Sequence, residues 1–175
     1  MKNRLAGLLV VIASVLFVNA SLVAQTAPAW KQYSYPSDGF AISAPSAPTY
    51  SNQVKPTDAG NVEIHTYSIP LGNNGIVMIS SSEVRGLEQD SPKTRLQMAK
   101  TGALKAGNAT LTTEKEIVLG LYQGLQYEAT TANLHVRARM YIVKNRLFQL
   151  LEISPLNTAF PADAERISSS FKVVN

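Results

Sequence analysis

Apolar and polar side chains alternate over much of this chain. Between residues 62 and 69, for example, Val62 and Ile64 fall on one side of an extended backbone, and Glu63 and His65 fall on the other. A period of two residues indicates a β-strand with one buried face. Strands are predicted on this basis over residues 40–44, 62–69, 76–84, 110–119, 125–130, 134–143 and 146–154.

Helical spacing replaces this alternation in two places. Apolar side chains recur every three or four residues between Pro92 and Ala106, after a capping residue, Ser91. This apolar stripe is narrow and rich in alanine, which favours close packing on a sheet. A shorter helix is predicted over residues 161–171. Hairpin-linked strands with two such helices predict an α+β fold, a mainly antiparallel sheet packed by an inner helix and a C-terminal helix.

Segments without either periodicity are expected to be loops or linkers. Residues 50–61 are polar and contain Pro56 and Gly60, so a loop is predicted there. Residues 25–32 are expected to lead into a single domain formed by residues 33–175. This length suits one domain with a core of its own.

The dipeptide Lys144-Asn145 predicts a tight hairpin that fixes a register. With these two residues as the loop, Val143 lies opposite Arg146 and Arg137 lies opposite Glu152. The preceding hairpin brings Glu128 beside Arg137 or His135. A row of charged side chains, Glu128, Arg137 and Glu152, is therefore expected on one face of the sheet.

Residues 1–24 have the three parts of a secretory signal peptide. Lys2 and Arg4 form a basic head, a long apolar stretch follows, and small residues end at Ala20 and Ala24. Cleavage is expected after Ala24, with Ala20 as the second choice, and a periplasmic or secreted location follows. The alternative is an uncleaved inner-membrane anchor, since residues 5–24 are about long enough to span a bilayer. In that case the leader is the only expected membrane contact.

Composition narrows the classes of function. The chain has no cysteine, which excludes disulfides, thiol catalysis and zinc–thiolate sites. Its formal charge of +4 includes Lys2 and Arg4 of the leader, and the other charges are interspersed rather than gathered in runs. Proteins that bind nucleic acids usually concentrate Lys and Arg on one face, so no nucleic-acid partner is expected.

Three residues on one predicted strand, His135, Arg137 and Arg139, form the candidate contact site. Alternate residues of a strand share a face, so the three side chains point the same way. One interpretation is a strip that contacts an anion or a partner protein. The other is a ladder of cross-strand charge pairs that stabilises the sheet.

His65 and His135 are the only histidines and the only obvious candidates for a base. A metal site would require both to meet carboxylates in space, and no HxH or HxxxH spacing accompanies them. A serine nucleophile would need one of them as its base, but no nucleophile-elbow, phosphate-loop or dinucleotide motif occurs. No catalytic, metal or cofactor-binding residue is therefore assigned, and no cofactor is expected.

Four stretches resemble motifs of the PsbP-like superfamily. They are residues 35–45 (YPSDGFAISAP), 124–128 (GLQYE), 139–150 (RMYIVKNRLFQL) and 169–172 (SSFK). The superfamily comprises exported or lumenal α+β domains, including the photosystem subunit PsbP, Mog-type Ran-binding proteins and DcrB-like periplasmic proteins. The resemblance covers most of residues 33–173 and implies an antiparallel sheet packed by helices. It also implies a non-enzymatic binding role, although no metal or partner site of the family matches a motif here.

The expected function is therefore that of an exported accessory or binding protein of the cell envelope, with a protein or another envelope component as partner. Two alternatives remain open. One is a small domain that binds a ligand or metal through His65, His135 and the Glu128–Arg137 region. The other is a small serine hydrolase that uses one of the histidines.

Overall fold

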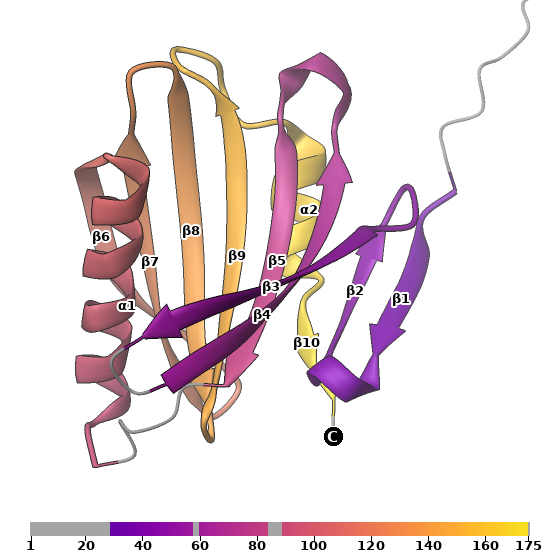
Figure 1. The fold of residues 1–175 in the computed structure, drawn as a ribbon. Coiled ribbons are helices and arrows are strands. Elements are labelled where there is room, and N and C mark those ends of the chain that lie inside the picture. The colour runs from indigo at the N-terminus through magenta and orange to yellow at the C-terminus, as the bar shows by residue number, and fades with distance from the viewer. Residues whose placement is uncertain (1–28, 58–59, 84–88, 175) are drawn as a thin grey trace, which may run out of the picture.

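Two antiparallel sheets and two helices form the part of the chain described by the computed structural model, residues 29–57, 60–83 and 89–174 (Figure 1). The large sheet has seven strands in the order β3-β4-β5-β9-β8-β7-β6, and the small sheet has three in the order β1-β2-β10. The strands are β1 (Lys31–Tyr35), β2 (Phe40–Ala44), β3 (Thr49–Thr57), β4 (Gly60–Pro70), β5 (Ile76–Glu83), β6 (Thr110–Leu119), β7 (Tyr122–Thr130), β8 (Leu134–Val143), β9 (Arg146–Pro155) and β10 (Lys172–Val173). The helices are α1 (Pro92–Gly107) and α2 (Ala162–Ser169), with short 3-10 turns η1 (Pro36–Asp38) and η2 (Gly72–Asn74).

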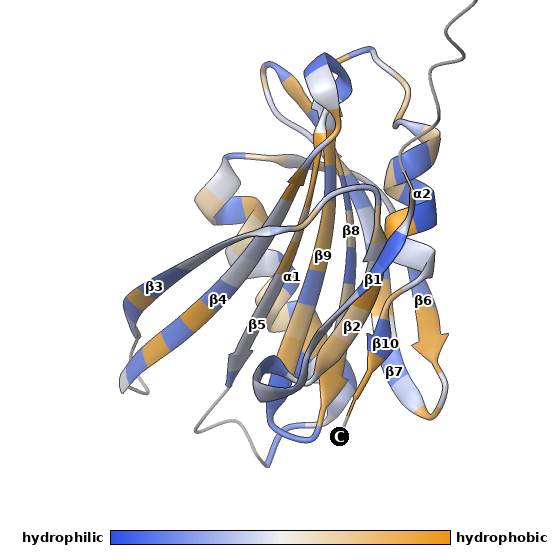
Figure 2. Cartoon of the chain, turned by 90° about the vertical axis from the view of Figure 1, so that its right-hand side faces the viewer, coloured by the Kyte–Doolittle hydropathy of each residue, from blue (hydrophilic) through white to orange (hydrophobic). Residues whose placement is uncertain are grey.

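The large sheet has a core on each face. Helix α1 packs against β7 and β8 on one face, where Leu96 meets Leu125 and Met140. Helix α2 and the small sheet cover the other face, where Phe40 and Phe148 are buried (Figure 1). Alternation of apolar and polar residues along β4 matches this arrangement (Figure 2). The predicted α+β fold with an inner and a C-terminal helix is therefore confirmed.

Helix α1 begins and ends as its sequence predicts. The Ser91 hydroxyl accepts a hydrogen bond from the Thr94 N–H at 3.1 Å, and Pro92 occupies the first turn. Asn108 ends the helix in the left-handed conformation, with a φ of 47°. Leu96 is buried against the sheet, whereas Ala106 at the end of the predicted stripe is exposed.

The loop predicted over residues 50–61 is wrong, because most of this segment forms strand β3. Its residues pair with β4 from Thr49↔Ser68 to Thr57↔Gly60. β3 is an edge strand, so its backbone needs only one partner and its side chains need not be apolar. Pro56 is tolerated there because proline has no backbone N–H to donate, and on an edge strand every second N–H needs no partner in the sheet.

The sequence pattern did not predict two further strands, β1 and β10. β1 begins at Lys31, inside the segment predicted as a leader, and pairs along its whole length with β2. β10 has only two residues, Lys172 and Val173, which pair with Ala41 and Phe40. The strand predicted over residues 125–130 also begins earlier than expected, because β7 starts at Tyr122.

The predicted signal peptide, residues 1–24, lies outside the described residues. Within the ranges that the structure does describe, neither helix has the length and apolar character needed to cross a membrane.

Candidate functional site

The predicted β8–β9 register is confirmed, and it places Arg137 between two carboxylates. Arg137 lies opposite Glu152 on β9 and opposite Glu128 on β7. Its Nε donates to Glu128 Oε1 at 2.8 Å, and its Nη1 donates to Glu152 Oε2 at 3.2 Å. Glu152 is only 1% exposed, and this burial raises the pKa of its carboxyl group. The charged row is thus partly a buried network.

Helix α2 brings a further carboxylate, Glu165, to the same cluster. Arg139 Nη2 donates to both Glu165 carboxylate oxygens, at 2.7 and 2.6 Å, and Arg137 Nη1 donates to Glu165 at 3.2 Å. The hydrogen bond from Arg139 lowers the pKa of Glu165. Both arginines of the predicted contact strip therefore bind carboxylates of the domain itself, which favours the interpretation as a structural charge ladder.

His135 lies at the end of this cluster. Its Nε2 is 3.2 Å from Glu128 Oε2, and its ring centroid is 4.3 Å from that of Phe160. The Arg137 guanidinium also lies over the Phe160 ring, at 4.4 Å from its centroid. Burial raises the pKa of Glu128, but hydrogen bonds from Arg137 and His135 outweigh it and leave that pKa below its usual value.

A second polar cluster, which the sequence did not indicate, lies where the small sheet meets the large one. Asp38 in η1 is 6% exposed, and its Oδ1 is 2.5 Å from His65 Nδ1. The Tyr67 hydroxyl donates to Asp38 Oδ2, and the Ser81 hydroxyl donates to the Asp38 main-chain oxygen at 3.2 Å. Burial, followed by the bond to Asp38, raises the pKa of Tyr67. Side chains of β4 and β5 thus hold the β1–β2 turn in place.

His65 is held between two carboxylates. Nδ1 faces Asp38, and Nε2 lies 3.3 Å from Glu63 Oε1. Ser81 is the cross-strand neighbour of His65, yet its hydroxyl is directed to the Asp38 main chain. In enzymes that use a histidine base, a carboxylate bound to one ring nitrogen orients the ring. The Asp38–His65 pair has this arrangement.

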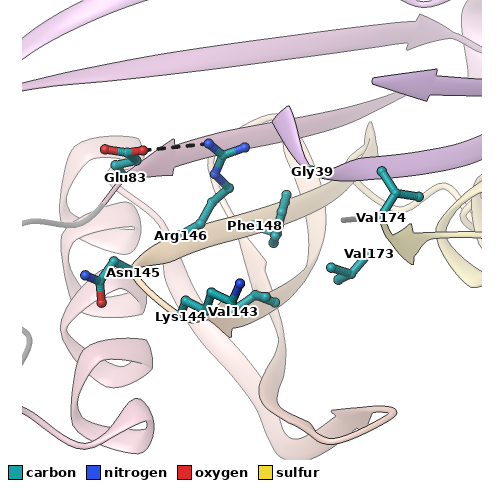
Figure 3. A pocket seen from close by; sticks show the side chains of 9 residues that line it. All are labelled: Gly39, Glu83, Val143, Lys144, Asn145, Arg146, Phe148, Val173 and Val174. Atoms are coloured by element: carbon teal, nitrogen blue, oxygen red, sulfur yellow. Dashed lines mark ion pairs between the residues drawn. The ribbon is translucent and has the colours of Figure 1, made fainter. Parts of the chain in front are cut away.

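Two adjoining pockets lie beside this second cluster and share Glu83 and Arg146. The polar pocket has a volume of about 350 Å³ and contains Asp38 and His65. The other has a volume of about 440 Å³ and is lined by Gly39, Glu83, Val143, Lys144, Asn145, Arg146, Phe148, Val173 and Val174 (Figure 3). We call this second cavity the hairpin pocket, because the β8–β9 hairpin forms its base.

Arg146 lines both pockets. Its Nη1 donates to the Ser37 main-chain oxygen at 3.0 Å, and its Nη2 lies 3.8 Å from Glu83 Oε1 (Figure 3). Arg146 therefore ties β9 to the β1–β2 turn and to the end of β5.

The two histidines are too far apart to share a ligand. In register, His65 lies level with Ser81, Phe148 and Tyr141 across β5, β9 and β8. His135 is six residues from Tyr141 along β8. Three strand spacings and six residue rises separate the histidines by roughly 14 Å and roughly 20 Å in the two directions. Zinc–nitrogen distances of about 2 Å exclude a shared metal, and no group of three or more ligating side chains within the described ranges could hold one.

The sequence found the first cluster but missed the second. Arg137, Glu128 and Glu152 belong to adjacent hairpins, so turn length alone set their register. Asp38 lies in the turn between two strands of the small sheet, and His65 lies in the large sheet, and no local pattern reports how two sheets pack. The residues Ser37-Asp38-Gly39 are typical of a turn, but nothing near them in the sequence indicates the partner of Asp38.

Comparison with known proteins supports the fold. No protein-family model matches the sequence, and no curated protein shows significant similarity to it. Among solved structures, the chain is similar to the solution structure of cyanobacterial PsbP (CyanoP) from Synechocystis sp. PCC 6803, with a TM-score of 0.54 and 14% sequence identity. The similarity covers 89% of this chain and 98% of that chain. The chain therefore has a PsbP-like α+β fold, as its sequence motifs implied.

Proposed function

We propose that this protein is an exported, non-catalytic accessory protein that binds a protein or another component of the cell envelope. The signal-type leader supports export to the periplasm or beyond. The PsbP-like fold is consistent with a binding role, but a fold does not determine a function.

The observation that carries this proposal is the way the two histidines are used. His65 links the carboxylates of Asp38 and Glu63, and His135 lies between Glu128 and the Phe160 ring. Both therefore make contacts that hold elements of the domain together. A general base needs a free nitrogen directed at the proton it removes, whereas both ring nitrogens of His65 lie beside carboxylates of the domain.

Export is tested by mass spectrometry of the protein from its native envelope. We expect a mature N-terminus immediately after Ala24 or Ala20. An intact Met1 in that fraction would contradict cleavage and favour the membrane anchor.

Binding is tested by capture of the tagged mature domain from its own envelope extract. We expect a component that is retained by the domain and displaced by excess untagged domain. Retention that excess untagged domain does not reduce, or no retention above the tag alone, would contradict the proposal.

A second candidate, a hydrolase or small-ligand site, rests on one specific observation. The Asp38–His65 pair lines the polar pocket of about 350 Å³ with the Nε2 side of the ring toward Glu63. Turnover of an ester or peptide that is abolished in His65→Ala and kept in His135→Ala would establish this alternative. Turnover that is retained equally in both variants would exclude His65 as the base.

A further inference from the structure

We propose that the open edge of β10 and the adjoining hairpin pocket form a docking site for an extended, acidic segment of a partner protein, bound by strand addition. This inference deepens the proposed binding role and rests on it. It assigns that role to one place on the molecule and to one class of partner.

The main chain of β10 offers the first argument. β10 is the outer strand of the small sheet, with β2 as its one partner among the described strands. The Val174 N–H donates to the Gly39 main-chain oxygen at 3.0 Å. Successive residues of an antiparallel strand direct their N–H and C=O groups to opposite edges. The N–H and C=O groups of Val173 therefore point away from β2, toward the open side.

The hairpin pocket provides the second argument, because it lies beside this edge. Phe148 and Val143 are buried at 1% and 8% exposure and line the pocket together with Val173. An extended peptide paired with Val173 would place alternate side chains over these apolar residues. Strand addition takes its affinity from main-chain hydrogen bonds and its specificity from such pockets.

Charge gives the third argument and selects an acidic partner. Lys144 occupies the hairpin turn with a φ of 56°, and its ammonium group is turned toward the pocket (Figure 3). Within the described residues, no carboxylate forms an ion pair with it. Arg146 at the rim is already paired with Glu83, which leaves Lys144 as the cation available to a partner, and Asn145 points away (Figure 3). An acidic side chain or a terminal carboxylate of the partner would complement Lys144.

The test uses a short, capped peptide of alternating valine and glutamate as the probe. We expect the Val173 and Val174 amide resonances of the mature domain to shift on titration, with saturation at millimolar peptide or below. The matched peptide with lysine in place of glutamate should bind about three- to tenfold more weakly, because it loses the ion pair. A fully N-methylated peptide should be weakened to the same extent, because it loses main-chain hydrogen bonds. Each hydrogen bond or ion pair contributes about a kilocalorie per mole.

Variants of the domain test the same residues. Val173→Pro removes the outward N–H and should weaken the probe about three- to tenfold, while Val173→Ala keeps the N–H and should bind more tightly than Val173→Pro. Lys144→Glu should weaken it similarly, and Lys105→Glu on the exposed side of α1 is the charge-matched control. The N-methylated peptide keeps the test valid even if Val173→Pro does not fold.

Three results would overturn the inference. One is no shift at Val173 with millimolar peptide, and another is equal binding of the acidic and lysine peptides. The third is a dimer that Val173→Pro converts to a monomer, because a second copy would then be the occupant. If Val173→Pro and Lys144→Glu still capture the envelope component, the docking site is wrong while the proposed binding function stands.

Discussion

Gly124 on β7 is a position where a neighbouring side chain occupies the space of the missing Cβ. A Cβ built there would lie 2.5 Å from Tyr141 Cδ1 and 2.8 Å from the Met140 main-chain oxygen. Gly124→Ala therefore requires the Tyr141 ring to move out of a packed core. We expect a loss of about 2 kcal/mol in the free energy of unfolding, measured by urea denaturation.

Gly102 on α1 is the matched control for this substitution. A Cβ there meets nothing within 4 Å, so Gly102→Ala should stabilise the protein by about 0.5–1 kcal/mol through helix propensity. A Gly124→Ala protein as stable as Gly102→Ala would show that the Tyr141 ring does not pack on β7 as described.

Arg137 neutralises a buried carboxylate, so its loss has a specific consequence. In Arg137→Met, the cation left to Glu152 within the described ranges is Arg139, whose Nη2 is 3.7 Å from Glu152 Oε1. We expect a loss of about 3 kcal/mol in unfolding free energy, because a buried charge is left poorly compensated. Adding Glu152→Gln should restore about 1–2 kcal/mol of this loss. Additive losses in a denaturation-based double-mutant cycle would contradict a direct pairing.

At the scale of elements, α2 is attached to the sheet by carboxylates whose pKa shifts have opposite signs. Glu165 has a lowered pKa, so its contribution is present above the unfolded value of 4.5 and is lost as the pH falls through its folded pKa. Glu152 has a raised pKa, so its protonation increases stability as the pH falls toward 4.5.

Measurement of unfolding free energy against pH therefore distinguishes the two groups. The unmodified protein should lose stability as the pH falls below about 4.5, and Glu165→Gln should reduce this loss. The unmodified protein should gain stability as the pH falls toward about 4.5 from above, and Glu152→Gln should remove this gain. Changes of the same sign in the same pH range for both variants would contradict these environments.

Elements formed by local rules could be predicted from the sequence, and those formed by distant partners could not. The β8–β9 hairpin follows from two turn residues and alternation, and α1 follows from Ser91, Pro92 and its apolar spacing. β3 has a polar sequence and exists because the edge of β4 offers it a backbone partner. β10 is only two residues long, which is too short for any periodicity to show.

At the scale of the whole molecule, the candidate site depends on how the two sheets pack. Asp38, Arg146 and Val173 come from three distant parts of the chain and surround the two adjoining pockets. The sequence shows which side chains these are, but it does not show that they lie close together in space. It identified the arginines of β8, whose neighbours are set by hairpins, and it missed the cluster set by sheet packing.

The small sheet also sets where the domain begins, which a truncation series can test. Tyr35 of β1 packs on Tyr67 with ring centroids 4.1 Å apart, and Trp30 lies under the Arg166 guanidinium, 3.8 Å from the ring centroid. A chain that begins at Ala29 keeps both contacts, whereas one that begins at Ser37 loses β1 and uncovers the edge of β2. By thermal unfolding, we expect the first to match the mature protein within about 2 °C and the second to melt about 10 °C lower, since burial of β1 contributes about 3 kcal/mol. Equal melting temperatures for the two truncated chains would show that β1 adds nothing to the core, and that the domain begins at the β1–β2 turn.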